Sequence, residues 1–257
     1  LTTPSVVYFD TSGAIVGKEA IAAGEFEPDR LAQFAKRDMG ETAFSKEIRN
    51  QRLPAEVLQG IILKKLKDDT ELKLGAIKKV VITVPAFFNE PCRKATQDAG
   101  RLAGLEVLDI INEPTAAAIC FGIQQGFLSE DGTSRGQEQI LIYDLGGGTF
   151  DVTLMEIDGT KFTALATAGD VYLGGVDWDS RLVIHLAKAF QLEHDVDLLP
   201  DPVAMQMLQQ KAAETKHSLS TRESVTVFLS HEGLRLKQEV TRATFEDITA
   251  DLLDRTL

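Results

Sequence analysis

The sequence predicts an α/β fold with mixed sheets, because strand-like and helix-like segments alternate along most of the chain. Short apolar runs of strand character are separated by longer stretches that carry apolar residues at helical spacing. Several predicted strands are followed, after a short turn, by a second strand that runs back beside the first. Such hairpins supply the antiparallel strands of a mixed sheet. The 257 residues are enough for one or two domains with a sizeable core.

The N-terminal third opens on a predicted hairpin, with strands at 5–9 and 14–16. The segment 30–36 resembles a helix, and its pair Lys36-Arg37 is typical of a solvated helix end. Pro54 then begins an amphipathic helix that runs to about residue 74 and stops at Gly75.

Two strand-helix units follow, and the second places a carboxylate at a strand end. Strands are predicted at 79–84 and 105–111, and Asn89 caps the helix after the first. Because Pro114 fits the first helical position and disfavours a helical conformation before it, Glu113 is held at the strand-to-helix junction. Ligands of open α/β sheets bind beyond such strand ends, although a simple helix cap explains Glu113 equally well.

The strongest local signal is the hairpin at 140–157, whose tip is DLGGGTFD. An apolar run at 140–143 reads as a strand buried on both faces. Three glycines (Gly146, Gly147 and Gly148) follow, and without Cβ atoms their N–H groups can approach a phosphate. Asp144 and Asp151 flank them, and two carboxylates beside a phosphate cradle suit Mg²⁺. A plain glycine turn is the alternative.

The C-terminal half continues the alternation and contains a second glycine pair. Gly174 and Gly175 precede a helix, which makes them either a second anion site or a common turn. The remaining predicted elements are a strand at 161–167, helices at 177–191 and 202–219, strands at 224–229 and 234–241, and a helix from 243 onward.

Composition excludes several classes of function. A net charge of −12 and an isoelectric point near 4.8 argue against nucleic acid or an anionic membrane as the main partner. No apolar run approaches the length of a membrane-spanning helix. Cys92 and Cys120 have no metal-ligand or disulfide spacing, and the histidines form no zinc motif, so reduced thiols in a cytoplasmic setting are expected.

Nearly from end to end, the chain resembles the nucleotide-binding domain of DnaK-type (seventy-kilodalton heat-shock) chaperones. The motifs that carry the resemblance are TPSVV at 3–7, AKR at 35–37, VITVPAFFN at 81–89, ATQDAGRLAGLEV at 95–107, IINEPTAAA at 110–118, DLGGGTFD at 144–151 and LGGVDWDSRL at 173–182.

The resemblance implies the actin-like ATPase (ribonuclease H-like) fold, with ATP or ADP and Mg²⁺ between two lobes. Residues 1–122 would form the remainder of the first lobe and 123–257 the second. The family's N-terminal phosphate hairpin and C-terminal adenosine loop would fall outside this chain. The implied partners are client polypeptides held by a separate peptide-binding domain, a J-domain co-chaperone and a nucleotide-exchange factor.

The resemblance also assigns roles residue by residue. Lys36 would contact the γ-phosphate and the attacking water, and Glu113 would help orient that water. Thr149 would hold the β- and γ-phosphates together with the three glycines, and Asp144 and Asp151 would hold Mg²⁺ through its waters. Positions near the sugar and base of the nucleotide would be Gly174, Gly175, Lys216, His217 and Ser220.

Departures from the family pattern leave a rival hypothesis open. Ala213 stands where the family has a glutamate, Val176 replaces an acidic residue, and His217 sits where the family packs a side chain on the purine. The short segment between Phe44 and Ala55 indicates that the outer sheet of the first lobe is reduced or lost. The first hypothesis is an ATPase domain of a DnaK-like chaperone. The second is a degenerate nucleotide-binding or interaction module, and a sugar kinase of the same superfamily is a third.

Overall fold

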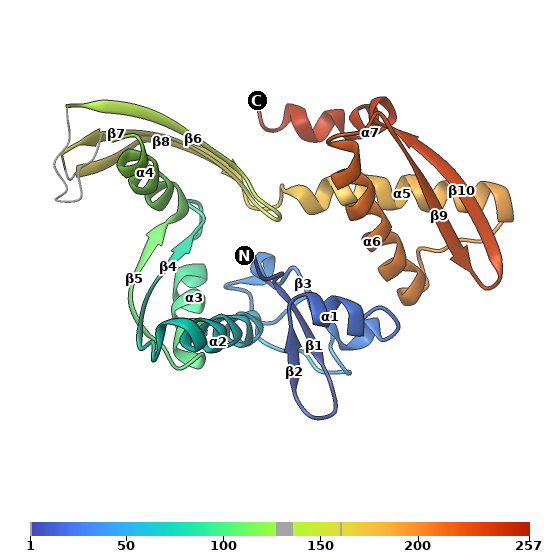
Figure 1. The fold of residues 1–257 in the computed structure, drawn as a ribbon, viewed down its shortest axis with the longest axis horizontal. Coiled ribbons are helices and arrows are strands. Elements are labelled where there is room, and N and C mark those ends of the chain that lie inside the picture. The colour runs from blue at the N-terminus through green and yellow to red at the C-terminus, as the bar shows by residue number, and fades with distance from the viewer. Residues whose placement is uncertain (1, 127–135, 160) are drawn as a thin grey trace.

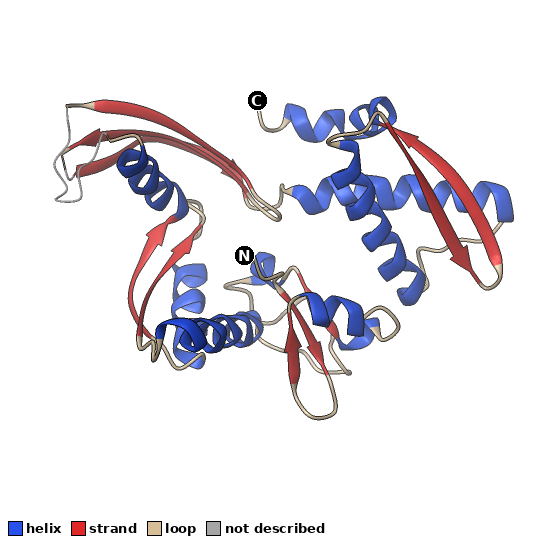
Figure 2. Ribbon diagram, viewed as in Figure 1, coloured by secondary structure: helices blue, strands red, loops and turns tan. Residues whose placement is uncertain are grey.

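The computed structural model describes residues 2–126, 136–159 and 161–257, and it confirms an α/β protein (Figure 1, Figure 2). The helices are α1 (Lys18–Ala23), α2 (Ala55–Leu74), α3 (Glu90–Leu102), α4 (Glu113–Gln124), α5 (Gly175–His194), α6 (Pro202–Leu219) and α7 (Arg242–Asp254), with two short 3₁₀ helices, η1 (Pro28–Arg30) and η2 (Ala35–Asp38). The strands are β1 (Val6–Phe9), β2 (Ala14–Val16), β3 (Leu31–Gln33), β4 (Lys79–Val84), β5 (Glu106–Asn112), β6 (Glu138–Leu145), β7 (Phe150–Asp158), β8 (Lys161–Asp170), β9 (Ser224–His231) and β10 (Leu234–Thr241). The sequence also predicts a polar, glycine-bearing loop at 124–139, and much of it lies outside the described residues.

The strands of the described residues form four sheets. Three are antiparallel, with strand orders β2-β1-β3, β6-β7-β8 and β10-β9, and the pair β4-β5 is parallel. The parallel pair is joined through α3, as a crossover connection requires. In Figure 1 the β6-β7-β8 sheet extends from α4 to the start of α5, so the tip of the β6-β7 hairpin lies beside that helix.

The prediction of a helix at 30–36 is wrong, because Leu31–Gln33 forms the edge strand β3. This strand pairs antiparallel with β1, and Ala32 lies opposite Val7. Pairing buries Leu31 and Ala32 completely or nearly so, which an isolated helix turn would not achieve. Phe34 then adopts a left-handed conformation, with φ of 63°, and the chain turns into η2.

The prediction that the strand at 140–143 is buried on both faces is also wrong. Ile140 and Ile142 pack under α4, but Leu141 is 67% exposed and Tyr143 is 49% exposed. The cause is that β6 pairs only with β7 in the described residues, and helix α4 covers just one face of the sheet. An apolar run alone does not distinguish a central strand from an edge strand.

The segment between η2 and α2 is compact and contains no strand ladder among its described residues. Its β-pairing there is one isolated bridge between Ile48 and Gln51. Phe44 and Ile48 instead turn inward and pack with Leu58 of α2. This segment therefore packs on α2 through apolar side chains and forms no sheet of its own in the described residues, as expected from its short length.

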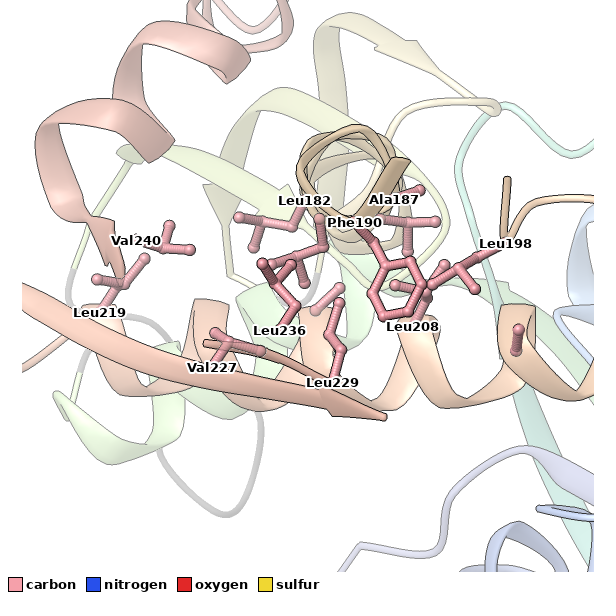
Figure 3. Packing of buried hydrophobic residues seen from close by; sticks show 14 residues of the cluster. Leu182, Ala187, Phe190, Leu198, Leu208, Leu219, Val227, Leu229, Leu236 and Val240 are labelled. Carbon is pink, nitrogen blue, oxygen red and sulfur yellow. The ribbon is translucent and has the colours of Figure 1, made fainter. Parts of the chain in front are cut away.

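The largest hydrophobic core joins α5, α6 and the β9-β10 hairpin (Figure 3). Phe190 of α5 and Leu208 of α6 are fully buried in this core, and Leu236 of β10 belongs to the same cluster. This core fixes the orientation of α5 and α6, and both helices carry predicted site residues at their ends. No helix in the described part of the chain is long and apolar enough to cross a membrane.

His185 on α5 is expected to make the protein acid-sensitive. Burial lowers the pKa of this imidazole below its ordinary value of 6.5, and its buried Nε2 makes no hydrogen bond in the described residues. Below pH 6.5 the unfolded chain therefore binds a proton that the folded chain refuses, so stability falls as the pH falls. Thermal melting from pH 7.5 to 5.5 should show this loss, and His185→Leu should flatten it. Equal pH dependence in both proteins would contradict the assignment.

Candidate functional site

The glycine loop is the four-residue connection from β6 to β7. The Gly146 N–H donates to the Thr149 carbonyl at 2.9 Å and closes the loop, and Thr149 is buried. In the strands on either side, Asp144 and Asp151 are direct antiparallel partners. Partners of this kind project from the same face of the sheet, so the two carboxylates flank the loop on one side as the sequence predicts.

Asp151 is a buried carboxylate beside the glycine loop. It is 4% exposed, and its Oδ1 has no hydrogen-bond partner in the described residues. Burial raises the pKa of the Asp151 carboxyl above its ordinary value, and the negative charge of Glu113 raises it further. The Asp144 carboxylate acts in the same direction, whereas the Phe87 backbone N–H and the Lys36 ammonium lower this pKa.

Lys36 and Glu113 meet although 76 residues separate them in the chain, and their Nζ and Oε1 atoms are 3.0 Å apart. Lys36 belongs to η2, and Glu113 is the first residue of α4, where β5 ends. Both charges act on Asp151 in the sheet next to them. Three separate segments thus bring an ammonium and two carboxylates together beside the glycine loop.

The second glycine pair lies directly against the first glycine cluster. The N–H of Gly175 donates to the Gly146 carbonyl at 2.9 Å, and the N–H of Val176 donates to the Gly147 carbonyl at 3.0 Å. A Cβ at Gly174 would lie 2.6 Å from the Gly148 nitrogen, which is closer than real Cβ atoms come. Gly174 is therefore required for close packing of the two turns, and Gly175 begins α5.

Arg37 belongs to the same region, and sequence reasoning assigned it no role. Its Nε donates to the Gly148 carbonyl at 3.0 Å, and its two terminal nitrogens donate to the two carboxylate oxygens of Asp177 at 3.2 and 2.6 Å. The only available signal was its place in the AKR motif. Its partners lie 111 and 140 residues away in the chain, so no local pattern could reveal them.

A cavity of about 370 Å³ adjoins the glycine turns and is lined by three of the positions predicted near the sugar and base, Gly175, Lys216 and Ser220. Its wall also includes Gly146, from the glycine loop, and side chains that sequence reasoning missed. The missed residues are Leu145, Trp178, Leu219, Arg242, Phe245 and Glu246.

The predicted residues on α6 are placed differently from one another. Lys216 donates to the Gly175 carbonyl at 2.8 Å and forms an ion pair with Asp179, also at 2.8 Å. Ser220 follows the end of α6, whereas His217 is exposed and is not among the residues that line the cavity. The structure therefore brings Lys216 and Ser220 to the cavity and leaves His217 outside its wall.

The donor set for a metal ion is small. In the described part of the chain no group of three or more His, Cys, Asp or Glu side chains could by itself hold a metal. The free Oδ1 of Asp151 and the adjacent Asp144 fit a cation such as Mg²⁺, which takes one or two carboxylates and completes its shell with waters and phosphate oxygens.

Comparison with known proteins gives a consistent result. The family model described as Hsp70 protein matches residues 1–257. "Chaperone protein DnaK" of Halobacterium salinarum is 43% identical over 263 residues, which cover 100% of this chain and 40% of the relative. The proteins of the same name from Thermotoga petrophila and Thermotoga neapolitana are 43% and 44% identical, covering 99% of this chain and 43% of each relative. The chain thus spans about two fifths of the length of these curated relatives.

Proposed function

This chain belongs to the Hsp70 family, and on that premise we propose that it binds and hydrolyses ATP as the nucleotide-binding domain of a DnaK-like chaperone. The fold proposed is the actin-like ATPase fold, with residues 1–122 in one lobe and 123–257 in the other. Contacts between these ranges support a shared cleft. They include the Gln33–Gln206 hydrogen bond at 3.2 Å and the Arg37–Asp177 pair.

One observation carries the proposal: an ammonium, two carboxylates and a glycine loop converge from separate segments. Phosphoryl transfer needs positioning and charge neutralisation more than covalent chemistry. The Lys36 ammonium would bind the γ-phosphate and the attacking water, and Glu113 would orient that water. The N–H groups of Gly147 and Gly148, with Thr149, would hold the β- and γ-phosphates. These are the chemical parts that ATP hydrolysis requires.

Asp144 and Asp151 would hold Mg²⁺ through its waters. When bound, the ion supplies positive charge that offsets the negative charge of the phosphates. Asp151 is suited to this role because its unpartnered, buried Oδ1 offers a lone pair that no group in the described chain uses. Asp144 lies opposite Asp151 in the hairpin and is exposed, so it would face the hydrated side of the ion.

The sugar and base of the nucleotide would lie at the cavity next to α6. Lys216, Ser220 and Gly175 line it, and we assign them to the nucleotide together with Gly174, which sets the shape of the turn. His217, which would stack on the purine, is exposed and lies outside the cavity wall. For the whole protein we propose that the bound nucleotide controls the binding and release of client polypeptides in the cytoplasm. A J-domain co-chaperone and a nucleotide-exchange factor would be its partners.

The proposal is tested by calorimetric titration of the intact gene product with Mg-ATP and Mg-ADP, together with its rate of phosphate release. Saturable binding with slow, continuous hydrolysis is the expected result. A second candidate is a degenerate module that does not turn over nucleotide, and the ion pair that already engages Lys216 with Asp179 favours it. Binding without turnover, or no binding, would replace the ATPase by this module.

Asp151→Asn should stabilise the nucleotide-free protein while it removes the benefit of Mg²⁺. Because the folded state raises the pKa of Asp151, the charged carboxylate destabilises the fold at every pH above that raised value. Removing the charge at pH 7 should therefore raise the melting temperature of the nucleotide-free protein. The affinity for ADP should then be the same with and without Mg²⁺.

Asp158→Asn, at the exposed far end of the same strand, is the matched control and should change neither quantity. A lower melting temperature for Asp151→Asn, with the Mg²⁺ effect retained, would contradict both assignments.

A further inference from the structure

The guanidinium group of Arg37 binds two parts of the protein that are remote in sequence. One N–H goes to the Gly148 carbonyl in the glycine loop, and the two terminal nitrogens bind both oxygens of Asp177 in the first turn of α5. The side chains of Arg37 and Asp177 are 21% and 24% exposed, so the pair is partly shielded from water. A two-pronged contact of this kind fixes direction as well as distance.

Asp177 extends the contact to the second glycine turn. Its Oδ2 also accepts the N–H of Gly174 at 2.8 Å, and Gly174 packs directly on the backbone of Gly147 and Gly148. The same carboxylate oxygen therefore binds both Arg37 and the turn that abuts the glycine loop. Moving Arg37 would disturb both glycine turns at once.

The other end of the contact is the short helix η2, which carries Lys36. This helix has only four residues, and it begins after Phe34, whose left-handed backbone is costly for a residue with a Cβ. Such a conformation persists only where surrounding contacts hold it. Arg37 follows Lys36 directly, so its contacts with Gly148 and Asp177 define where the Lys36 ammonium lies relative to the glycine loop.

We propose that Arg37 is a positioning residue for phosphoryl transfer: it fixes Lys36 against the glycine loop by binding the Gly148 carbonyl and Asp177 together. This inference rests on the proposed ATPase function. Lysine cannot replace arginine here, because a single ammonium cannot reproduce the two-pronged bond to a carboxylate and a third bond to a carbonyl. A misplacement of the order of 1 Å in a site of this kind can lower a rate about a hundredfold.

The first test uses Arg37→Lys in the intact gene product. We expect kcat for ATP hydrolysis to fall about 10- to 100-fold, with the Kd for Mg-ADP changed by less than about threefold. Asp177→Asn and the double variant should show the same loss as Arg37→Lys, because the two side chains act as one unit. Arg181→Lys is the matched control, since Arg181 of α5 pairs with Asp251 of α7, contacts neither glycine turn in the described hydrogen bonds, and should keep the wild-type kcat.

The second test does not depend on catalysis. In nucleotide-free protein, Arg37→Lys should accelerate hydrogen exchange at the amides of Gly146, Gly175 and Val176, which bond within the two glycine turns. Exchange in the β9-β10 hairpin should not change. A merely structural role would instead lower the melting temperature and weaken ADP binding as much as it lowers kcat.

The outcomes separate the inference from the function on which it rests. Wild-type kcat in Arg37→Lys would overturn the positioning role while leaving the ATPase proposal intact. Absence of hydrolysis by the wild type would refute the ATPase proposal and with it a role in phosphoryl transfer. Unchanged exchange in the two glycine turns would refute the structural link itself.

Discussion

Replacing Lys36 by alanine should lower ATP turnover at least about a hundredfold while the affinity for Mg-ADP changes by less than about threefold. The ammonium lies 3.0 Å from Glu113 and close enough to Asp151 to lower the pKa of that carboxyl. In the proposed ATPase it would stand where charge develops on the transferred phosphate, and losses of this size follow removal of one such group. ADP lacks the γ-phosphate, so its binding should be insensitive to the change.

Single-turnover hydrolysis and calorimetry on the intact gene product provide the two measurements. Lys64→Ala is the matched control, because Lys64 pairs with Asp68 on the exposed side of α2 and should keep full activity. Normal turnover by Lys36→Ala would mean that the role assigned to this lysine is wrong, and the site would need another source of positive charge.

Gly174→Ala should damage both stability and nucleotide binding. The added Cβ would meet backbone atoms of Gly147 and Gly148 at 2.6–2.7 Å, and backbone cannot move aside as a flexible side chain can. Overpacking of this kind costs about 1–3 kcal/mol, which lowers the melting temperature by several degrees. Because relief of the clash displaces the glycine loop, affinity for Mg-ADP should fall at least about tenfold.

Gly147→Ala separates the two effects. A Cβ at Gly147 meets no atom within 4 Å, and this glycine does not have a positive φ, so the melting temperature should stay at the wild-type value. Its methyl group would nevertheless project from the loop that we assign to the phosphates, and nucleotide affinity should drop. If Gly174→Ala melted like the wild type, the tight packing of the two turns would be disproved.

Where local sequence determines structure, the sequence predicted the fold well. The helix expected at 202–219 has those bounds as α6, since Asp201 accepts bonds from the first backbone N–H groups and Pro202 suits the first turn. Asn89 caps α3 as expected, and its side chain accepts from the Cys92 N–H. The β6-β7 hairpin also formed around its glycines. In each case a capping or turn residue specified the boundary.

Non-local contacts explain what the sequence could not predict. Leu31–Gln33 became a strand because β1 offers an edge for pairing, which no window of seven residues contains. The bond between Arg37 and Asp177 depends on how two distant segments meet, so Arg37 was indistinguishable from a solvated basic residue. By contrast Lys36, Glu113, Asp144 and Asp151 could be named in advance from family motifs, and the structure brings Lys36 and Glu113 into direct contact.

The pairing of Asp144 with Asp151 makes the length of the hairpin part of its chemistry. Successive side chains of a strand point to opposite faces, so a register slip of one residue would turn one carboxylate away from the other. The number of residues between them, six, must therefore stay fixed. In evolutionary terms, this loop should accept some exchanges of side chain but not an insertion or deletion, because a change of length would dismantle the pair of carboxylates in a single step.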